Sequence, residues 1–135
     1  WMMAQEAAQR MIAAEVEGSI INLASVLAFR TQKALSTYSI SKAAVAQMTR
    51  TMASELANHG IRVNAMAPGY IATDMNSAFL YSPRGEEMMR QVPTGRYGEA
   101  GELDECLLML SGDRSKYLTG AVIPIDGGHG LAIRD

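Results

Sequence analysis

Three short apolar runs, separated by segments of helical character, constrain the fold of this chain more than any other feature. The runs cover residues 19–24, 61–66 and 121–126. A long helical segment at residues 35–58 separates the first two runs, and a shorter one at residues 103–110 precedes the third. Strands that alternate with helices build a parallel sheet with helices packed on its faces. The sequence therefore predicts an α/β fold.

The helical segments contain the expected core positions and end signals. Gly60 is placed to end the long helix, whose predicted core face has a spacing of four: Ala44, Met48, Met52 and Leu56. In the shorter helix, the predicted core side consists of Leu103, Leu107 and Leu110. A further helical pattern runs from the first residues up to Gly18.

The remaining segments contain residues that restrict the backbone. Residues 71–98 include several prolines and glycines, which predict a mobile loop carrying one or two short helices. Pro124 in the last apolar run has no N–H to donate, so we expect that strand at an edge of the sheet. Asn22 and Asn64 are expected to satisfy backbone groups at the strand ends and are assigned no chemistry.

Tyr38 and Lys42 lie four residues apart in the long helix, so the phenol and the ammonium share one face. A phenol titrates near pH ~10 in water and exchanges protons poorly at neutral pH unless a nearby cation stabilises the phenolate. Ser25 follows the first apolar run, and active-site groups of parallel sheets lie at such strand ends. The three side chains form a candidate site for proton transfer to or from a carbonyl or alcohol oxygen.

The composition limits the alternatives. With 135 residues, 48% of them apolar, the chain can form one small domain, and its net charge of -2 gives no reason to expect nucleic acid or an anionic membrane as a partner. A single cysteine, Cys106, excludes an internal disulfide, and no apolar run has transmembrane length. Because a signal-peptide pattern is also absent, we expect a soluble cytoplasmic protein. His59 and His129 lack metal-ligand spacing, so we expect them on the surface and expect no metal site.

Four motifs follow one another along nearly the whole chain, at Gly18 to Ser25, Tyr38 to Ala44, Gly60 to Gly69, and Leu118 to Ala121 with Asp126 to Gly128. Together they resemble the short-chain dehydrogenase/reductase family. The likeness is greatest to 3-oxoacyl-(acyl-carrier-protein) reductases and to polyol or sugar dehydrogenases. A lone Tyr-x-x-x-Lys pair would be a weak signal, whereas the ordered set is specific. The resemblance implies part of a doubly wound Rossmann-like sheet, with three parallel strands and helices on both faces.

The resemblance also implies an NAD(P)-dependent oxidoreductase that moves a hydride between the nicotinamide and a carbonyl or alcohol substrate. Tyr38 would be the general acid/base, Lys42 would stabilise its phenolate and bind the ribose hydroxyls, and Ser25 would hold the substrate oxygen. The resemblance implies a cofactor-binding set of Tyr38, Lys42, Pro68, Gly69, Ile71 and Thr73, and a substrate-binding set of Ser25, Tyr38 and Tyr70. Thr73 has an alternative structural role, because Thr73-Asp74 could cap a following helix.

Members of this family open with a glycine-rich turn that binds the pyrophosphate, and this turn does not occur in the sequence. Residues 1–17 also contain no asparagine, a residue that the family carries in the helix before the serine strand. The resemblance therefore implies that residues 1–135 are one partial domain, the catalytic C-terminal half of a longer reductase that assembles as a homotetramer. The alternative is a truncated, non-catalytic chain that acts only as a folding or oligomerisation unit.

Overall fold

Three parallel strands form the central sheet of the computed structural model, which describes residues 1–131. They are β1 (Gly18–Leu23), β2 (Ile61–Pro68) and β5 (Val122–Ile125), in the order β1-β2-β5. Gly18 pairs with Ile61 at the start of β1, and the β2–β5 register runs from Ala65 opposite Val122 to Pro68 opposite Ile125. The predicted parallel sheet is confirmed, and β5, with Pro124, lies at the predicted edge.

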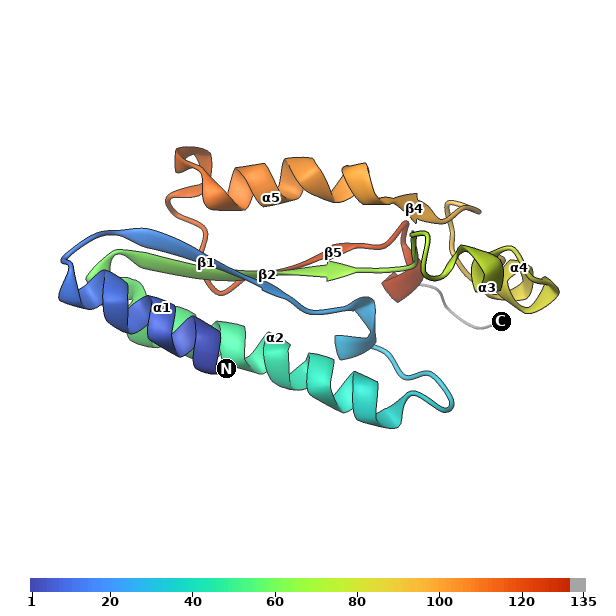
Figure 1. Cartoon of the computed structure of the whole chain (residues 1–135), viewed down its shortest axis with the longest axis horizontal. Helices are drawn as coiled ribbons and strands as arrows, with labels where there is room; N and C mark the ends of the chain where they lie inside the picture. Colours follow the sequence, from blue (N-terminus) through green and yellow to red (C-terminus); the bar gives the residue numbers. More distant parts are fainter. Residues whose placement is uncertain (132–135) are drawn as a thin grey trace.

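Helices cover both faces of this sheet, as predicted (Figure 1). On one face lie α1 (Met2–Ala13) and the long α2 (Ser36–Leu56), and on the other lies α5 (Asp104–Ser111). Helix α1 packs against β1, α2 packs mainly against β2, and α5 contacts both strands. Across residues 1–131, the helices are too short or too polar to span a bilayer.

The core forms where α1 and α2 meet the sheet, but the predicted core face of α2 was partly wrong. Met52 and Leu56 are buried, whereas Ala44 is exposed. A strict spacing of four advances by about 40° around a helix at each step, so it drifts off any one face. The buried face mixes steps of three and four and consists of Ala46, Thr49, Met52, Ala53 and Leu56.

Two other sequence expectations need correction. The first helix ends at Ala13 and does not reach Gly18, because the chain turns through Glu15, whose φ is 52°. In α5, Leu110 is fully buried while Leu107 is 45% exposed, because the buried side follows Leu103, Cys106 and Leu110.

The prediction that Asn22 and Asn64 satisfy backbone groups is confirmed for Asn64 but not for Asn22. The Asn64 side chain donates to the carbonyl of Leu118 (2.9 Å) and accepts from the N–H of Ala121 (3.0 Å), so it bonds backbone groups as predicted. The Asn22 amide instead donates to the hydroxyl of Thr49 on α2, at 3.0 Å. That side chain therefore joins β1 to a helix rather than to neighbouring backbone.

The segment after β2 contains the predicted short helices, α3 (Ser77–Leu80) and α4 (Pro83–Met89). It also contains a strand pair that the sequence did not predict: β3 (Ile71–Ala72) runs parallel to β4 (Gly98–Glu99). Strands of two residues carry too little pattern to be recognised from sequence. This pair closes the segment into a lobe beside the carboxyl ends of the main strands (Figure 1).

Candidate active site

The carboxyl ends of β1 and β2 lead into the candidate residues. Ser25 follows β1 by two residues, is only 7% exposed, and accepts a hydrogen bond from the N–H of Leu27 at 3.2 Å. It thereby caps the 3₁₀ turn η1 (Val26–Ala28), which packs against α2. The serine hydroxyl is thus fixed at the strand end, next to the helix that carries the other two candidates.

Tyr38 and Lys42 lie on the first turns of α2 and share a face, as their spacing predicts. The Lys42 Nζ lies 5.6 Å from the centroid of the Tyr38 ring, a cation–π geometry. The same ammonium donates to the carbonyl of Leu23, the last residue of β1, at 2.9 Å. Lys42 therefore joins the start of α2 to the end of the strand that leads to Ser25.

The hydroxyl groups of this cluster are not joined to one another. Within residues 1–131, no hydrogen bond links the Tyr38 hydroxyl to Ser25 or to Lys42. Tyr38 is 44% exposed, so its ring is accessible from solvent. The arrangement leaves a phenol, held beside a cation, open to a molecule that approaches this end of the sheet.

The predicted cofactor-binding residues follow β2 directly. Pro68 ends the strand, and the N–H of Gly69 donates to the carbonyl of Ile125 at 3.0 Å. A Cβ atom at position 69 would lie 2.8 Å from the Cα of Asp126, so only glycine fits this close approach of two backbones. Ile71 lies in β3. Thr73 is exposed, and its N–H donates to the side chain of Asn76, so the predicted Thr73 cap of a helix does not form.

Tyr70, the predicted substrate-binding residue, is partly buried among groups from three loops. Its hydroxyl donates to the Oε1 of Gln32 at 2.8 Å. Its ring contacts Tyr97 edge-on, with centroids 6.0 Å apart, and lies tilted against His129 at 4.9 Å. Burial raises the pKa of the Tyr70 phenol, although the bond to Gln32 and the charge of Arg30 oppose that rise.

His129 corrects another prediction, because it is buried and only 2% exposed. The carboxylate of Asp126 accepts from the N–H of Gly128 (2.9 Å) and of Gly130 (2.6 Å), which turns the chain back and places the imidazole against Tyr70. Its Nδ1 has no hydrogen-bond partner among residues 1–131. Burial, followed by the charge of Arg30, lowers the pKa of His129, while Asp126 opposes this effect.

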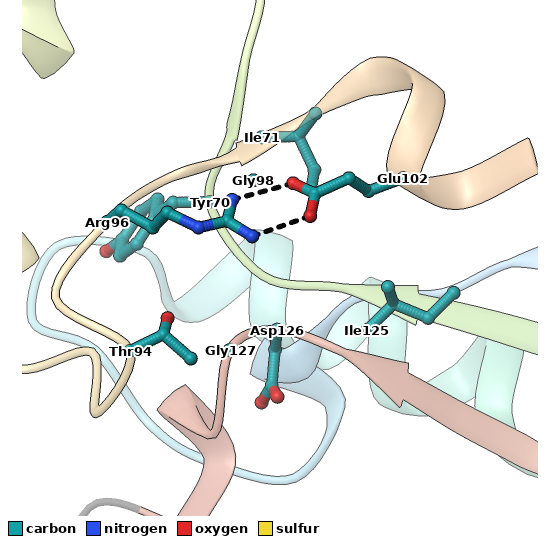
Figure 2. Close-up of a pocket in the computed structure, with 9 residues that line it drawn as sticks. All are labelled: Tyr70, Ile71, Thr94, Arg96, Gly98, Glu102, Ile125, Asp126 and Gly127. Carbon is teal, nitrogen blue, oxygen red and sulfur yellow. Dashed lines mark hydrogen bonds and ion pairs between the residues drawn. The ribbon is translucent and has the colours of Figure 1, made fainter.

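A pocket of about 110 Å³ opens at the carboxyl ends of β2 and β5 (Figure 2). Tyr70 and Ile71 line it, but Ser25, Tyr38 and Lys42 do not. Across its mouth, Arg96 forms two hydrogen bonds with Glu102, at 2.8 and 2.6 Å, while the carboxylate of Asp126 points away from them. The structure therefore divides the predicted site between Ser25, Tyr38 and Lys42, at the end of β1 and the start of α2, and a pocket beside β3.

A family model described as enoyl-(acyl carrier protein) reductase matches residues 1–130. The chain belongs to this family of short-chain dehydrogenases/reductases. The 3-oxoacyl-(acyl-carrier-protein) reductase FabG of Thermotoga maritima is 44% identical over 111 residues, covering 82% of this chain and 45% of the relative. The 2-dehydro-3-deoxy-D-gluconate 5-dehydrogenase of Escherichia coli is 39% identical over 129 residues, covering 95% and 51%. The chain thus spans about half the length of the curated relatives it matches.

Solved structures of the family share the fold of this short-chain dehydrogenase/reductase chain. A gluconate 5-dehydrogenase from Burkholderia cenocepacia, in complex with NADP and tartrate, matches with a TM-score of 0.90 and 32% identity over 96% of this chain and 51% of that one. A 4-hydroxyisoleucine dehydrogenase complexed with NADH matches with a TM-score of 0.93 and 27% identity, covering 98% and 55%. These likenesses confirm the predicted Rossmann-like architecture.

Several polar residues at this edge of the sheet were not predicted from the short-chain dehydrogenase/reductase motifs. Arg30, Gln32, Arg96 and Glu102 lie outside the four motifs and make contacts that depend on tertiary structure. Only Glu102 carried a sequence signal, because Glu99 and Glu102 have the spacing of a capping box, and both of its hydrogen bonds form at the start of η3 (Ala100–Leu103). In residues 1–131, no group of three or more His, Cys, Asp or Glu side chains is placed to hold a metal ion.

Proposed function

We propose that this chain provides the catalytic residues of an NAD(P)-dependent oxidoreductase that interconverts an alcohol and a carbonyl compound. Tyr38 exchanges a proton with the substrate oxygen, Lys42 stabilises the phenolate, and Ser25 donates a hydrogen bond to the same oxygen. The bound nicotinamide supplies or accepts the hydride. Membership of the family and the names of the relatives, all dehydrogenases or reductases, support this reaction class.

One observation carries the proposal: the position of the Lys42 ammonium. It lies over the Tyr38 ring and is hydrogen-bonded to the end of β1, so a positive charge stands beside the phenol at the edge where Ser25 follows the strand. The ammonium thus joins the Tyr38 ring to the strand end that leads to Ser25. The partly exposed Tyr38 can then be reached by a substrate and can accept or release a proton.

We further propose that NAD or NADP binds along Pro68, Gly69, Ile71 and Thr73, with Lys42 and Tyr38 near its ribose. Two observations support this. The gluconate 5-dehydrogenase and the 4-hydroxyisoleucine dehydrogenase were solved with NADP and with NADH. Pro68 also ends β2, and Gly69, Ile71 and Thr73 follow it at the carboxyl edge of the sheet, where ligands of open α/β sheets bind.

Residues 1–135 would then be the catalytic half of the protein, completed by a dinucleotide-binding half and assembled as a cytoplasmic homotetramer. That the chain spans about half of each curated relative supports this division. So does β1, which pairs with β2 alone among the described strands and leaves its other edge open to a further strand.

A second function, a folding or oligomerisation unit without catalysis, is favoured by the exposed apolar side chains of the face built by α1 and α2. Met2, Met3 and Ile40 are 79%, 87% and 70% exposed. Apolar groups gathered on one face favour association with another protein surface. This function predicts an oligomer that forms normally and transfers no hydride, whichever residue occupies position 42.

The Lys42→Met substitution in the complete protein tests the proposed function. We expect turnover at pH 7 to fall by at least ~100-fold, because the proposed acid/base loses the ammonium beside its ring and the cofactor loses its proposed contact at the ribose. Far-ultraviolet circular dichroism should show the fold unchanged. Lys116→Met is the matched control, since Lys116 is exposed and pairs with Asp113 at the opposite end of the sheet. Equal turnover in both variants would contradict the role of Lys42.

A further inference from the structure

Arg30 lies in the connection between Ser25 and Tyr38, two residues beyond η1. Its Nη1 donates to the carbonyl of His129, so the guanidinium is held where the loop after β1 meets the loop after β5. The contact between η1 and η5 (His129–Leu131) keeps these loops together. Arg30 is therefore tied to the same edge of the sheet as the proposed catalytic residues.

Arg30 keeps N–H donors that the described residues do not use. A guanidinium has five N–H donors, and within residues 1–131 Arg30 makes one hydrogen bond and no ion pair. The neighbouring Gln32 accepts from Tyr70 through Oε1, and its amide N–H groups make no hydrogen bond within the described part of the chain. The Asp126 carboxylate, whose charge raises the pKa of His129, already accepts hydrogen bonds from two backbone N–H groups.

Such a set of groups suits a carboxylate. An ionised carboxylate only accepts hydrogen bonds, and the planar fork of an arginine can bind both of its oxygens at once. Arg30 is also partly buried, so its charge is less well solvated than that of a fully exposed arginine. A bound anion would compensate for this loss, and Gln32 could add a neutral donor beside it.

We propose that the substrate is a hydroxy acid, or the corresponding oxo acid, whose carboxylate is bound by Arg30 with the amide of Gln32 beside it. This inference rests on the proposed function and names the substrate class of the same site. In the oxidation, the alcohol carbon gives a hydride to the oxidised nicotinamide and the hydroxyl gives its proton to the Tyr38 oxygen. The product is a ketone, and the carboxylate is unchanged.

The names of two similar proteins agree with a hydroxy acid or oxo acid as the substrate. One is a gluconate 5-dehydrogenase solved with tartrate, and another is a 2-dehydro-3-deoxy-D-gluconate 5-dehydrogenase. Both names denote compounds that carry a carboxylate beside hydroxyl or oxo groups. A third relative, a galactitol 2-dehydrogenase 41% identical to this chain, is named for an uncharged polyol, so the family name alone does not decide between them.

The test compares gluconate with sorbitol, which has the same carbon chain and a neutral hydroxymethyl group in place of the carboxylate. Binding to the complete protein with NADP is measured by isothermal titration calorimetry, and NADPH formation is followed in parallel. We expect gluconate to bind more tightly than sorbitol. Arg30→Gln should weaken gluconate binding by roughly 10- to 100-fold and leave sorbitol binding unchanged.

Two further variants make the result decisive. Arg30→Lys keeps the charge and loses the fork, so its gluconate affinity should lie between those of the wild type and Arg30→Gln. Arg50→Gln is the matched control, because Arg50 is exposed on α2 and should not affect either ligand. The NADP affinity of each variant is measured first by the same calorimetry, so a misfolded variant is detected by loss of NADP binding.

The outcomes separate this inference from the proposed function. If gluconate binds through Arg30 but no NADPH forms, the carboxylate site stands and the proposed reaction fails. If NADPH forms equally from both compounds and Arg30→Gln changes nothing, the reaction stands and the carboxylate site is wrong. Absence of gluconate binding to the wild type would also overturn the inference.

Discussion

Two residues of the candidate site, Gly69 and Lys42, each lie where separate elements of the fold come into contact. At Gly69, the chain leaving β2 passes directly against Asp126, where the chain leaves β5. At Lys42, one ammonium contacts both an aromatic ring and a strand-end carbonyl. In each case the side chain, or its absence, joins two elements that are far apart in sequence.

Gly69→Ala should destabilise the protein by about 1 to 3 kcal/mol, because the new methyl would overlap backbone and Cβ atoms of Asp126 that cannot move independently. Urea unfolding measures this difference. Gly101→Ala is the control: its Cβ would have only one neighbour within 4 Å, the Asp104 carboxylate at 3.9 Å. A Gly69→Ala variant as stable as the wild type would show that the two loops are not packed as described.

Glu102 should titrate well below an ordinary glutamate. Its hydrogen bonds from Arg96, followed by that from the N–H of Glu99, lower its pKa from 4.5 to about 2. Because the folded pKa is depressed, the pair stabilises the fold above the ordinary pKa, and this effect is lost as the pH falls towards 2. A carboxyl-carbon NMR titration should show this midpoint. Arg96→Met should raise it towards 4.5, whereas Arg114→Met should leave it unchanged; a midpoint near 4.5 in the wild type would refute the pairing.

The elements hold their positions through polar contacts as well as through the core. Asn64 on β2 bonds the backbone that leads into β5, and Arg62 bonds the carbonyls of Leu110 and Gly112 at the end of α5, each at 3.0 Å. These two side chains of the central strand fix the neighbouring strand and the helix above it. The sheet edge that carries the candidate site depends on both.

Replacing Asn64 with leucine should cost about 2 to 4 kcal/mol of unfolding free energy, because the Leu118 carbonyl and the Ala121 N–H lose their partner while Asn64 is fully buried. Chemical denaturation gives the value. Asn58→Leu, at an exposed position of η2 (Ala57–His59), should change it little. Equal stability of the two variants would contradict the bridging role of Asn64.

The turn after α1 is another test at this scale. Glu15 adopts a left-handed conformation with φ of 52°, and the N–H of Val16 reaches the carbonyl of Met11 at 3.0 Å, a common way to end a helix. Glycine adopts this conformation without the steric cost of a side chain, so Glu15→Gly should raise the stability by about 0.5 to 1 kcal/mol. Gln9→Gly, inside α1, should lower it by a similar amount. Destabilisation by both would place Glu15 outside the left-handed region.

Across the whole molecule, the sequence predicted the features that depend on long patterns. The three strands, their parallel order with β5 at an edge, and the long helix all followed from apolar runs and from Pro124. Side-chain exposure was harder to predict, because it depends on which neighbour covers a face. Ala44 and His129 show this, since one lies exposed on α2 and the other is buried under Tyr70.

Some residues of the candidate site were predicted from the sequence and others were not, again because contacts between distant parts of the chain are hard to predict. Ser25, Tyr38 and Lys42 were predicted from motif and spacing, and the structure places the lysine beside the tyrosine ring. Arg30 and Gln32 were missed, because their partners lie 99 and 38 residues away. Contacts across such distances leave no local pattern in a single sequence.

The 135 residues produced alone should not reduce NADP in the presence of an alcohol substrate. The sequence contains no glycine-rich turn between a strand and a helix to bind the pyrophosphate. Absorbance of NADPH measures the reaction, with the complete protein as the positive control. An ordinary rate from the isolated chain would show that the dinucleotide binds without that turn.

Hydride transfer by the Tyr38→Phe variant of the complete protein tests the central claim most directly. The substitution removes one oxygen and keeps the ring over which Lys42 lies. We predict that kcat falls by at least ~100-fold while the Kd for NADP changes by no more than about twofold, because the proton exchange is lost and the other proposed cofactor contacts, Lys42 among them, remain. Turnover within a few-fold of the wild type would contradict the assignment of Tyr38 as the general acid/base.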